Sequence, residues 1–99
     1  MPIPTQVRLI HCAETIKGGI ATYLRELLVQ QVLAFKAGEI AVVVPQSQLT
    51  ELPRLDGVVF YAYDDVPGQR ARNAFKLGRQ VQRLMLANPG AVVHVHSTF

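Results

Sequence analysis

Residues 7–28 read VRLIHCAETIKGGIATYLRELL, and this stretch decides the fold. Its first part, up to Cys12, is an apolar run that predicts a buried strand, and a short polar loop follows. The chain then passes Gly18 and Gly19 into residues 19–36, where apolar positions recur with the period of a helix. A strand that runs through a glycine turn into a helix is typical of an α/β sheet. The helix start leaves backbone N–H groups unpaired and carries partial positive charge, so it can hold an anion.

The rest of the chain continues the alternation of strands and helices. Residues 39–44 (EIAVVV) and 57–63 (GVVFYAY) predict strands, with a short turn of helix capped by Ser47 between them. A second long helix is expected over residues 69–87 and a fourth strand over 91–96. This order, β-α-β-(short α)-β-α-β, predicts an α/β fold with a parallel, doubly wound (Rossmann-like) sheet in the strand order 3-2-1-4.

Length and composition favour one folded domain. The chain has 99 residues, of which 49% are hydrophobic and 17% charged, so the composition excludes a disordered chain. Neither a membrane-spanning run nor a signal peptide is visible, and we expect a cytoplasmic location. The fourth predicted strand has no neighbour after it, because the sequence stops at Phe99. We therefore expect residues 1–99 to be an incomplete domain, truncated after the fourth strand.

Basic residues form a stripe on the second helix. No Asp or Glu follows Asp65, and the helix carries Arg72, Lys76, Arg79 and Arg83 at spacings that place them on one side. The opposite side, expected to face the sheet, consists of Ala74, Gly78, Val81 and Met85. The stripe predicts contact with an anionic surface such as the inner face of a membrane. The alternative is an ordinary solvated helix face. No aromatic residues alternate with the basic ones, so nucleic acid is not an expected partner.

The histidines of the fourth strand offer a second candidate site. His94 and His96 are two residues apart and share one side of the strand. His96 ends the strand beside Ser97, where ligands bind in open parallel sheets, whereas His94 is expected to be a hydrogen-bonded core residue. A metal needs further ligands, His11 is the only other histidine, and the pattern H-x-H-x-D-H fails at Ser97. We therefore expect no metal site.

Common nucleotide-binding motifs are absent. The chain contains neither G-x-G-x-x-G nor a P-loop ending in GK[ST], which argues against dinucleotide cofactors and P-loop chemistry. Binding of a diphosphate by the backbone amides at Gly18 and Gly19 is still compatible with the sequence, and Lys17 would add a positive charge there. Lys17 as a solvated loop residue is the alternative.

Three segments together resemble the start of a family 4 glycosyltransferase, a retaining enzyme with the GT-B fold. The opening VRLIHCAETIKGGIATYLREL resembles the first strand, glycine-rich loop and first helix of that family. EIAVVVP resembles its second strand, and AVVHVHS resembles the DVVHxHS segment that ends its fourth strand, with Gly90-Ala91 where an acidic residue is common. The resemblance covers essentially the whole chain.

The resemblance implies that residues 1–99 belong to the N-terminal Rossmann-like domain, which mainly binds the acceptor. Gly18 and Gly19 would then bring backbone amides to the diphosphate of a nucleotide-sugar donor. The acceptor side of the cleft would be lined by Glu14, Thr15, Lys17, His96 and Ser97. The acceptor would be a polysaccharide or glycolipid, no cofactor or metal is needed, and the donor domain lies beyond this chain. The chain alone would then not be catalytically competent.

Two readings compete with this one. The chain could be a small non-catalytic α/β domain that pairs with another protein through its exposed fourth strand. It could also be a basic nucleic-acid-binding domain, which the absence of interleaved aromatic residues disfavours. The sequence does not specify the sugar, the nucleotide or the linkage.

Overall fold

A four-stranded parallel sheet forms the centre of the molecule. The structure, a computed structural model, describes residues 4–16 and 19–96. The strands are β1 (Leu9–Ala13), β2 (Ile40–Val43), β3 (Val58–Phe60) and β4 (Val92–His96), and their spatial order is β3-β2-β1-β4. Every pairing between them is parallel. The predicted α/β architecture and strand order are confirmed.

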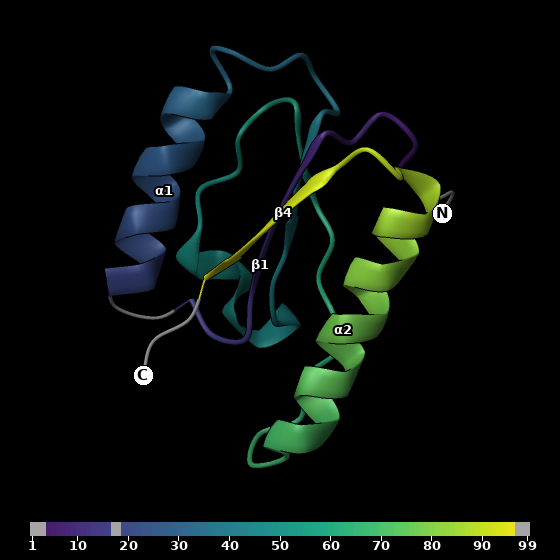
Figure 1. The fold of residues 1–99 in the computed structure, drawn as a ribbon. Helices are drawn as coiled ribbons and strands as arrows, with labels where there is room; N and C mark the ends of the chain where they lie inside the picture. The colour runs from purple at the N-terminus through teal and green to yellow at the C-terminus, as the bar shows by residue number, and fades with distance from the viewer. Residues whose placement is uncertain (1–3, 17–18, 97–99) are drawn as a thin grey trace.

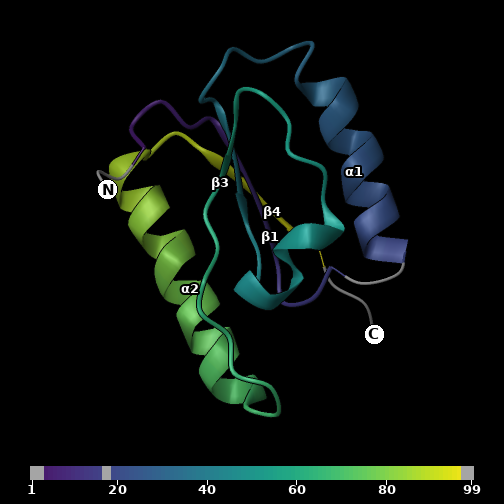
Figure 2. The ribbon, with the colours of Figure 1, turned by 180° about the vertical axis from the view of Figure 1, so that it is seen from behind.

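Two helices lie on opposite sides of this sheet, as Figures 1 and 2 show from its two edges. They are α1 (Gly19–Gln31) and α2 (Arg70–Ala87), and a short 3₁₀ helix, η1 (Gln46–Glu51), connects β2 toward β3. The first helix was expected to extend to residue 36 but ends at Gln31. After Gln31 the backbone tightens, because the N–H of Ala34 donates to the Gln31 carbonyl oxygen at 2.9 Å, which is a three-residue spacing.

The two central strands are buried on both faces, as the continuous apolar runs predicted. Alternate residues of β1 and β2 point to α1 and to α2, so each helix packs on its own apolar layer. The layer beneath α1 includes Ala13, Ile20, Leu24, Leu28, Ile40 and Val42. The layer beneath α2 includes Val7, Ile10, Cys12, Ala41, Val43 and Leu84. These two layers fix β1, whose carboxyl end carries the site described below.

The inward face of α2 differs from the predicted one. Leu84 is the buried residue of the helix, and Leu77 and Val81 are partly buried against the sheet. Of the four residues expected to face inward, only Val81 does so; Ala74 and Gly78 are exposed and Met85 is 45% exposed. The helix is rotated because its larger leucine side chains occupy the space over β1 and β2, where burial removes more apolar surface from water.

The fourth strand lies at the edge of the sheet. Within the described residues it pairs only with β1, and Val92 and Val95 are each 64% exposed. The expected apolar edge strand is therefore present. Among the described residues, no helix is both long and apolar enough to cross a membrane.

Candidate functional site at the carboxyl edge of the sheet

Three connections meet where β1, β2 and β3 end. They are the loop after β1, the start of η1, and the loop that leads from β3 into the first turns of α2 (Figure 1). In parallel α/β sheets, ligands bind at this edge. The connections enclose a pocket of about 440 Å³. Its walls are formed by Glu14, Thr15, Ser47, Gln48, Tyr63, Asp65, Pro67, Gly68, Arg70, Asn73 and His96.

Gln48 holds the loop after β1 in place. Its Oε1 accepts a hydrogen bond from the backbone N–H of Ile16 at 2.7 Å and one from the Thr15 hydroxyl at 3.1 Å. Ile16 is fully buried in the layer beneath α1 and anchors the same loop from below. As a result, Thr15 lies at the pocket wall, where the sequence placed it.

Asp65 is fixed by two bonds from Ser47. The backbone N–H of Ser47 donates to Oδ1 at 3.0 Å, and the Ser47 hydroxyl donates to Oδ2 at 2.5 Å. These hydrogen bonds stabilise the carboxylate and lower the pKa of Asp65 below its ordinary value. Ser47 was expected to cap the short helix. The structure corrects this, because Pro45 precedes η1 without a side-chain cap bond and the Ser47 hydroxyl is used by Asp65.

An ion pair forms one rim of the pocket and a phenol lies at its base. Arg70 Nε lies 3.0 Å from Glu14 Oε1, and both side chains are solvent-accessible. Beneath them the buried Tyr63 donates its hydroxyl to the Glu14 carbonyl oxygen at 3.2 Å. Burial, reinforced by the charges of Asp65 and Glu14, raises the pKa of Tyr63 to about 12, so the phenol stays protonated. The pocket therefore combines two carboxylates with amide and guanidinium donors, and its hydroxyl groups, which donate to Asp65, Gln48 and Glu14, keep lone pairs that can accept.

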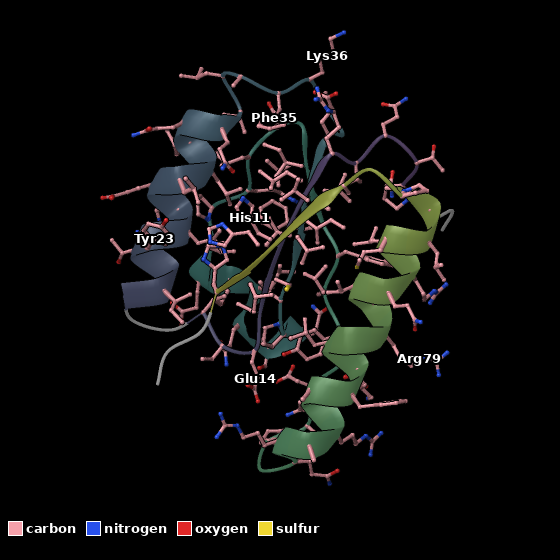
Figure 3. All side chains as sticks on the ribbon, viewed as in Figure 1. His11, Glu14, Tyr23, Phe35, Lys36 and Arg79 are labelled. Atoms are coloured by element: carbon pink, nitrogen blue, oxygen red, sulfur yellow. The ribbon has the colours of Figure 1, made fainter. Side chains whose placement is uncertain are left out.

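His96 lies at the pocket wall and belongs to a buried histidine pair. His96 Nε2 is 2.9 Å from Nδ1 of His11, and His11 Nε2 is 2.7 Å from Gln31 Oε1. Because the amide oxygen of Gln31 only accepts, we assign the His11 proton to Nε2, and Nδ1 then accepts from His96. Burial lowers the pKa of His11 and lowers the pKa of His96 to about 4, with neighbouring histidines adding to both effects. Figure 3 shows His11 between α1 and the sheet, and Glu14 near the end of β1.

His94 is not the core histidine that the sequence predicted. It is exposed, whereas His96, two residues later, is buried. The reason is the position of β4 at the edge of the sheet, where Tyr23 of α1 lies beside His96, with ring centroids 5.8 Å apart, while His94 stays exposed. The His94 ring nevertheless stays close, with its centroid 4.1 Å from that of His96.

The glycine pair is only partly within the described residues. Gly19 begins α1, is exposed, and a Cβ added there would meet no described atom within 4 Å. Its φ is outside the left-handed region, so the position does not require glycine for backbone reasons. Lys17, Gly18 and Ser97 were also assigned to the site, and they lie outside the described residues.

The basic stripe on α2 is not uniform. Lys76 is turned to the loop before the helix, where its Nζ donates to the Asp64 carbonyl oxygen at 2.8 Å and lies 3.5 Å from Asp64 Oδ2. Arg72, Arg79 and Arg83 are exposed, and no carboxylate of the described residues lies within 4.0 Å of them. Arg79 points away from the helix and the sheet in Figure 3. Three residues of the stripe therefore offer free positive charge.

Sequence reasoning found one side of the pocket and missed the other. Glu14, Thr15 and His96, three of the residues that the sequence assigned to the acceptor side, line this one pocket. The residues it missed follow the second and third strands, and they are Ser47, Gln48, Tyr63, Asp65, Arg70 and Asn73. The same rule that selected Glu14, the carboxyl end of a parallel strand, applies to Ser47, Gln48 and Tyr63, which follow β2 and β3 closely. It does not reach Arg70 and Asn73, which lie in the first turn of α2.

Comparisons with known proteins identified no relative of this chain. No family model, no curated protein and no solved structure matches this chain significantly.

Proposed function

We propose that this chain is the acceptor-side domain of a glycosyltransferase that moves a sugar from a nucleotide-sugar donor to a glycan or lipid-linked acceptor. The pocket at the carboxyl edge of the sheet would hold a saccharide of the acceptor. The start of α1 would meet the donor diphosphate, and a second domain would bind the nucleotide. The resemblance in the sequence suggested this division, and the chemistry of the pocket supports it.

The composition of the pocket wall is the observation that carries the proposal. A sugar hydroxyl both donates and accepts hydrogen bonds, so carboxylates flanked by amide and hydroxyl groups suit it. Asp65 and Glu14 supply acceptors. Donors come from the guanidinium N–H groups of Arg70 other than Nε, which is bonded to Glu14, and from the second amide hydrogen of Asn73, whose first hydrogen donates to the Val66 carbonyl oxygen. Asp65 keeps its charge and its orientation through the two bonds from Ser47. These fixed groups meet the requirement for a few well-placed polar contacts in a small-molecule site.

The start of α1 supports the donor half of the proposal. It lies at the same edge of the sheet as the pocket (Figure 1), and Gly19 leaves its backbone open to an approaching group. Unpaired N–H groups at a helix start favour the negative charge that develops on a diphosphate leaving group. The first turn of α1 contains no acidic residue that would oppose this charge.

Nuclear magnetic resonance titration of the ¹⁵N-labelled 99-residue chain tests the saccharide site. Methyl α-glucoside, methyl α-mannoside and methyl α-galactoside serve as probes, with UDP-glucose and GDP-mannose alongside. We expect at least one glycoside to shift the backbone amides of Thr15, Gln48 and Asn73. The nucleotide sugars should bind no more tightly than that glycoside, because the nucleotide belongs to the second domain.

Asp65→Asn is the test variant, because it removes the charge and keeps the shape. It should abolish the amide shifts, whereas the matched control Asp56→Asn, an exposed aspartate outside the pocket, should retain them. Shifts that persist unchanged in Asp65→Asn, or the absence of shifts with every glycoside, would overturn the proposal.

We further propose that α2 brings the protein to the inner face of an anionic membrane. Arg72, Arg79 and Arg83 are exposed, and apolar side chains accompany them on the helix, with Phe75 66% and Leu86 75% exposed. A helix that presents both kinds of residue binds an anionic lipid surface by combining charge attraction with shallow apolar insertion.

Cosedimentation with vesicles tests the membrane proposal. Vesicles rich in phosphatidylglycerol should bind the chain, and vesicles of phosphatidylcholine alone should not. Arg83→Glu should weaken the binding several-fold, because each basic residue near the surface contributes about 1 kcal/mol. The control Arg54→Glu, which makes the same charge change away from α2, should have a smaller effect. Equal losses in the two variants would mean that only net charge matters and would overturn the assignment to α2.

A further inference from the structure

All three histidines of the chain lie together between α1 and the edge of the sheet. His11 on β1 and His94 on β4 are direct partners in the parallel register, and His96 follows two residues later on the same side of its strand. His11 is distant from the others in sequence, and only the pairing of β1 with β4 brings it to them. Their ring centroids are 4.1 to 5.4 Å apart.

We propose that His11, His94 and His96 form a binding site for a divalent transition metal ion of the zinc type. Each residue offers one ring nitrogen, and these three atoms all lie within 4.8 Å of one another. Tetrahedral zinc with Zn–N bonds of about 2.0–2.1 Å needs ligand nitrogens roughly 3.3–3.4 Å apart. Closing the site therefore requires a shift on the order of an ångström. The exposed His94 ring has the room to make that shift.

Gln31 orients the central ligand. It accepts the Nε2–H of His11, which leaves Nδ1 facing the other two rings. A hydrogen bond to the far nitrogen of a ligating histidine fixes its tautomer and orientation in known metal sites. The hydrogen bond now joining His11 and His96 would give way to two metal bonds. The ring proton of His96 would then reside on Nδ1, so binding needs no net loss of protons.

The donor set selects the class of metal. Three imidazoles and no carboxylate or thiolate form the cluster within the described residues. Imidazole suits Zn²⁺, Cu²⁺ and Ni²⁺, whereas Mg²⁺ and Ca²⁺ prefer oxygen ligands. Cys12 is the neighbour of His11 in sequence but packs in the layer beneath α2, on the other face of the sheet. The exposure of His94 leaves a fourth position that water can occupy, which is the arrangement of an open three-histidine zinc site.

A structural role accounts for only part of this cluster. The hydrogen-bonded chain from Gln31 through His11 to His96 satisfies the two buried rings. The His94 ring is not needed to satisfy the two buried rings, and water can satisfy its own nitrogens because it is exposed. The metal site explains why His94 also faces the pair. It does not depend on the proposed transferase activity.

Metal binding is tested with the protein free of any histidine tag. Calorimetric titration with ZnCl₂ should give one site per chain, and CoCl₂ should produce the intense visible absorption of tetrahedral Co²⁺. His94→Ala should reduce Zn²⁺ affinity at least tenfold without unfolding the chain, because His94 is exposed. Gln31→Ala should weaken it about 10–100-fold, as expected for a group that orients a ligand.

Cys12→Ala is the matched control and should bind Zn²⁺ like the wild type. Thermal melting gives a second readout: Zn²⁺ should raise the melting temperature of the wild type and not that of His94→Ala. The absence of Zn²⁺ binding by the wild type would overturn the proposal. Equal affinity in wild type and His94→Ala would also overturn it, since another group would then hold the metal.

Discussion

At the scale of single residues, the pocket depends on Asp65 and its neighbour Ser47. Sequence analysis assigned Ser47 to a helix cap, because serine before a helical turn commonly accepts backbone N–H groups. In the structure the Ser47 hydroxyl donates to a carboxylate that lies 18 residues later in the sequence. Local sequence gives no sign of this contact, since it exists only once β2 and β3 are paired.

Ser47→Ala should raise the pKa of Asp65 toward its ordinary value of 3.8, because the first cause of its low pKa is the bond from the Ser47 side chain. The remaining bond from the Ser47 backbone should keep part of the shift. A carboxylate with a lowered folded-state pKa stabilises the fold above its unfolded-state pKa, and this stability is lost as the pH falls through the folded-state pKa. Carbon-detected titration of the Asp65 carboxyl group measures the shift directly.

The same variant makes a prediction about stability. The difference in unfolding free energy between wild type and Ser47→Ala should be present at pH 7 and should shrink under acidic conditions as Asp65 protonates. It should be modest, because the carboxylate is largely solvated. An unchanged Asp65 pKa in Ser47→Ala would show that the hydroxyl bond does not set the charge at the pocket.

At the scale of elements, α2 is attached to the sheet through few side chains. Leu84 is fully buried, whereas Leu86, two residues later, is 75% exposed. The helical period placed the basic side of α2, but the inward side predicted from it was wrong, because Leu77 and Leu84 pack on the sheet in place of Ala74, Gly78 and Met85. The period does not predict how far α2 is rotated about its own axis, because the size of the side chains over β1 and β2 decides that rotation.

Leu84→Ala should lower the unfolding free energy by about 2–5 kcal/mol, the usual range for a buried leucine that leaves a cavity. Leu86→Ala is the matched control and should change it by less than about 0.5 kcal/mol. Urea denaturation followed by circular dichroism gives both values. Similar losses in the two variants would mean that α2 packs through a different face.

The edge strand β4 predicts self-association. Its outer side is unpaired within the described residues, and Val92 and Val95 are exposed beside it. Such an edge pairs readily with another strand, and a lysine there opposes pairing. Val92→Lys should therefore reduce the oligomers that the wild type forms at high concentration, as measured by size-exclusion chromatography with light scattering.

Leu33→Lys, which places the same charge at an exposed leucine outside the sheet, is the control and should leave the oligomers in place. A wild type that stays monomeric at high concentration would contradict the prediction. The alternative reading, a non-catalytic domain that pairs through β4, also predicts association. The saccharide titration separates the two readings, because a domain that only pairs through β4 has no reason to bind glycosides in the pocket at the carboxyl ends of its strands.

At the scale of the whole molecule, the strand order could be predicted and the full site could not. Buried strands such as EIAVVV show themselves as continuous apolar runs, and alternation with helices leaves few parallel topologies. The pocket instead combines polar residues from separate loops, whose lengths and turns decide which side chains meet. The histidine cluster has the same origin, because His11 reaches His94 only through the register of β1 and β4.

The central claim is that the start of α1 and the adjacent pocket form the cleft of a sugar transferase. The most direct test is Gly19→Val in the full-length native protein, for which the proposal expects a donor domain in addition to this chain. Turnover is measured as release of UDP or GDP from nucleotide sugars in the presence of acceptor, with thermal melting in parallel. Gly90→Val is the matched control, since Gly90 is also exposed, has an ordinary φ and lies at the other end of the strands.

We predict that Gly19→Val lowers turnover about 10²-fold, because its side chain occupies the approach to amides that stabilise developing charge. Its melting temperature should stay close to that of the wild type, since no described atom lies within 4 Å of an added Cβ. Gly90→Val should keep full turnover. If Gly19→Val melts normally and retains near-normal turnover, the glycine is only part of a turn and the central claim is wrong.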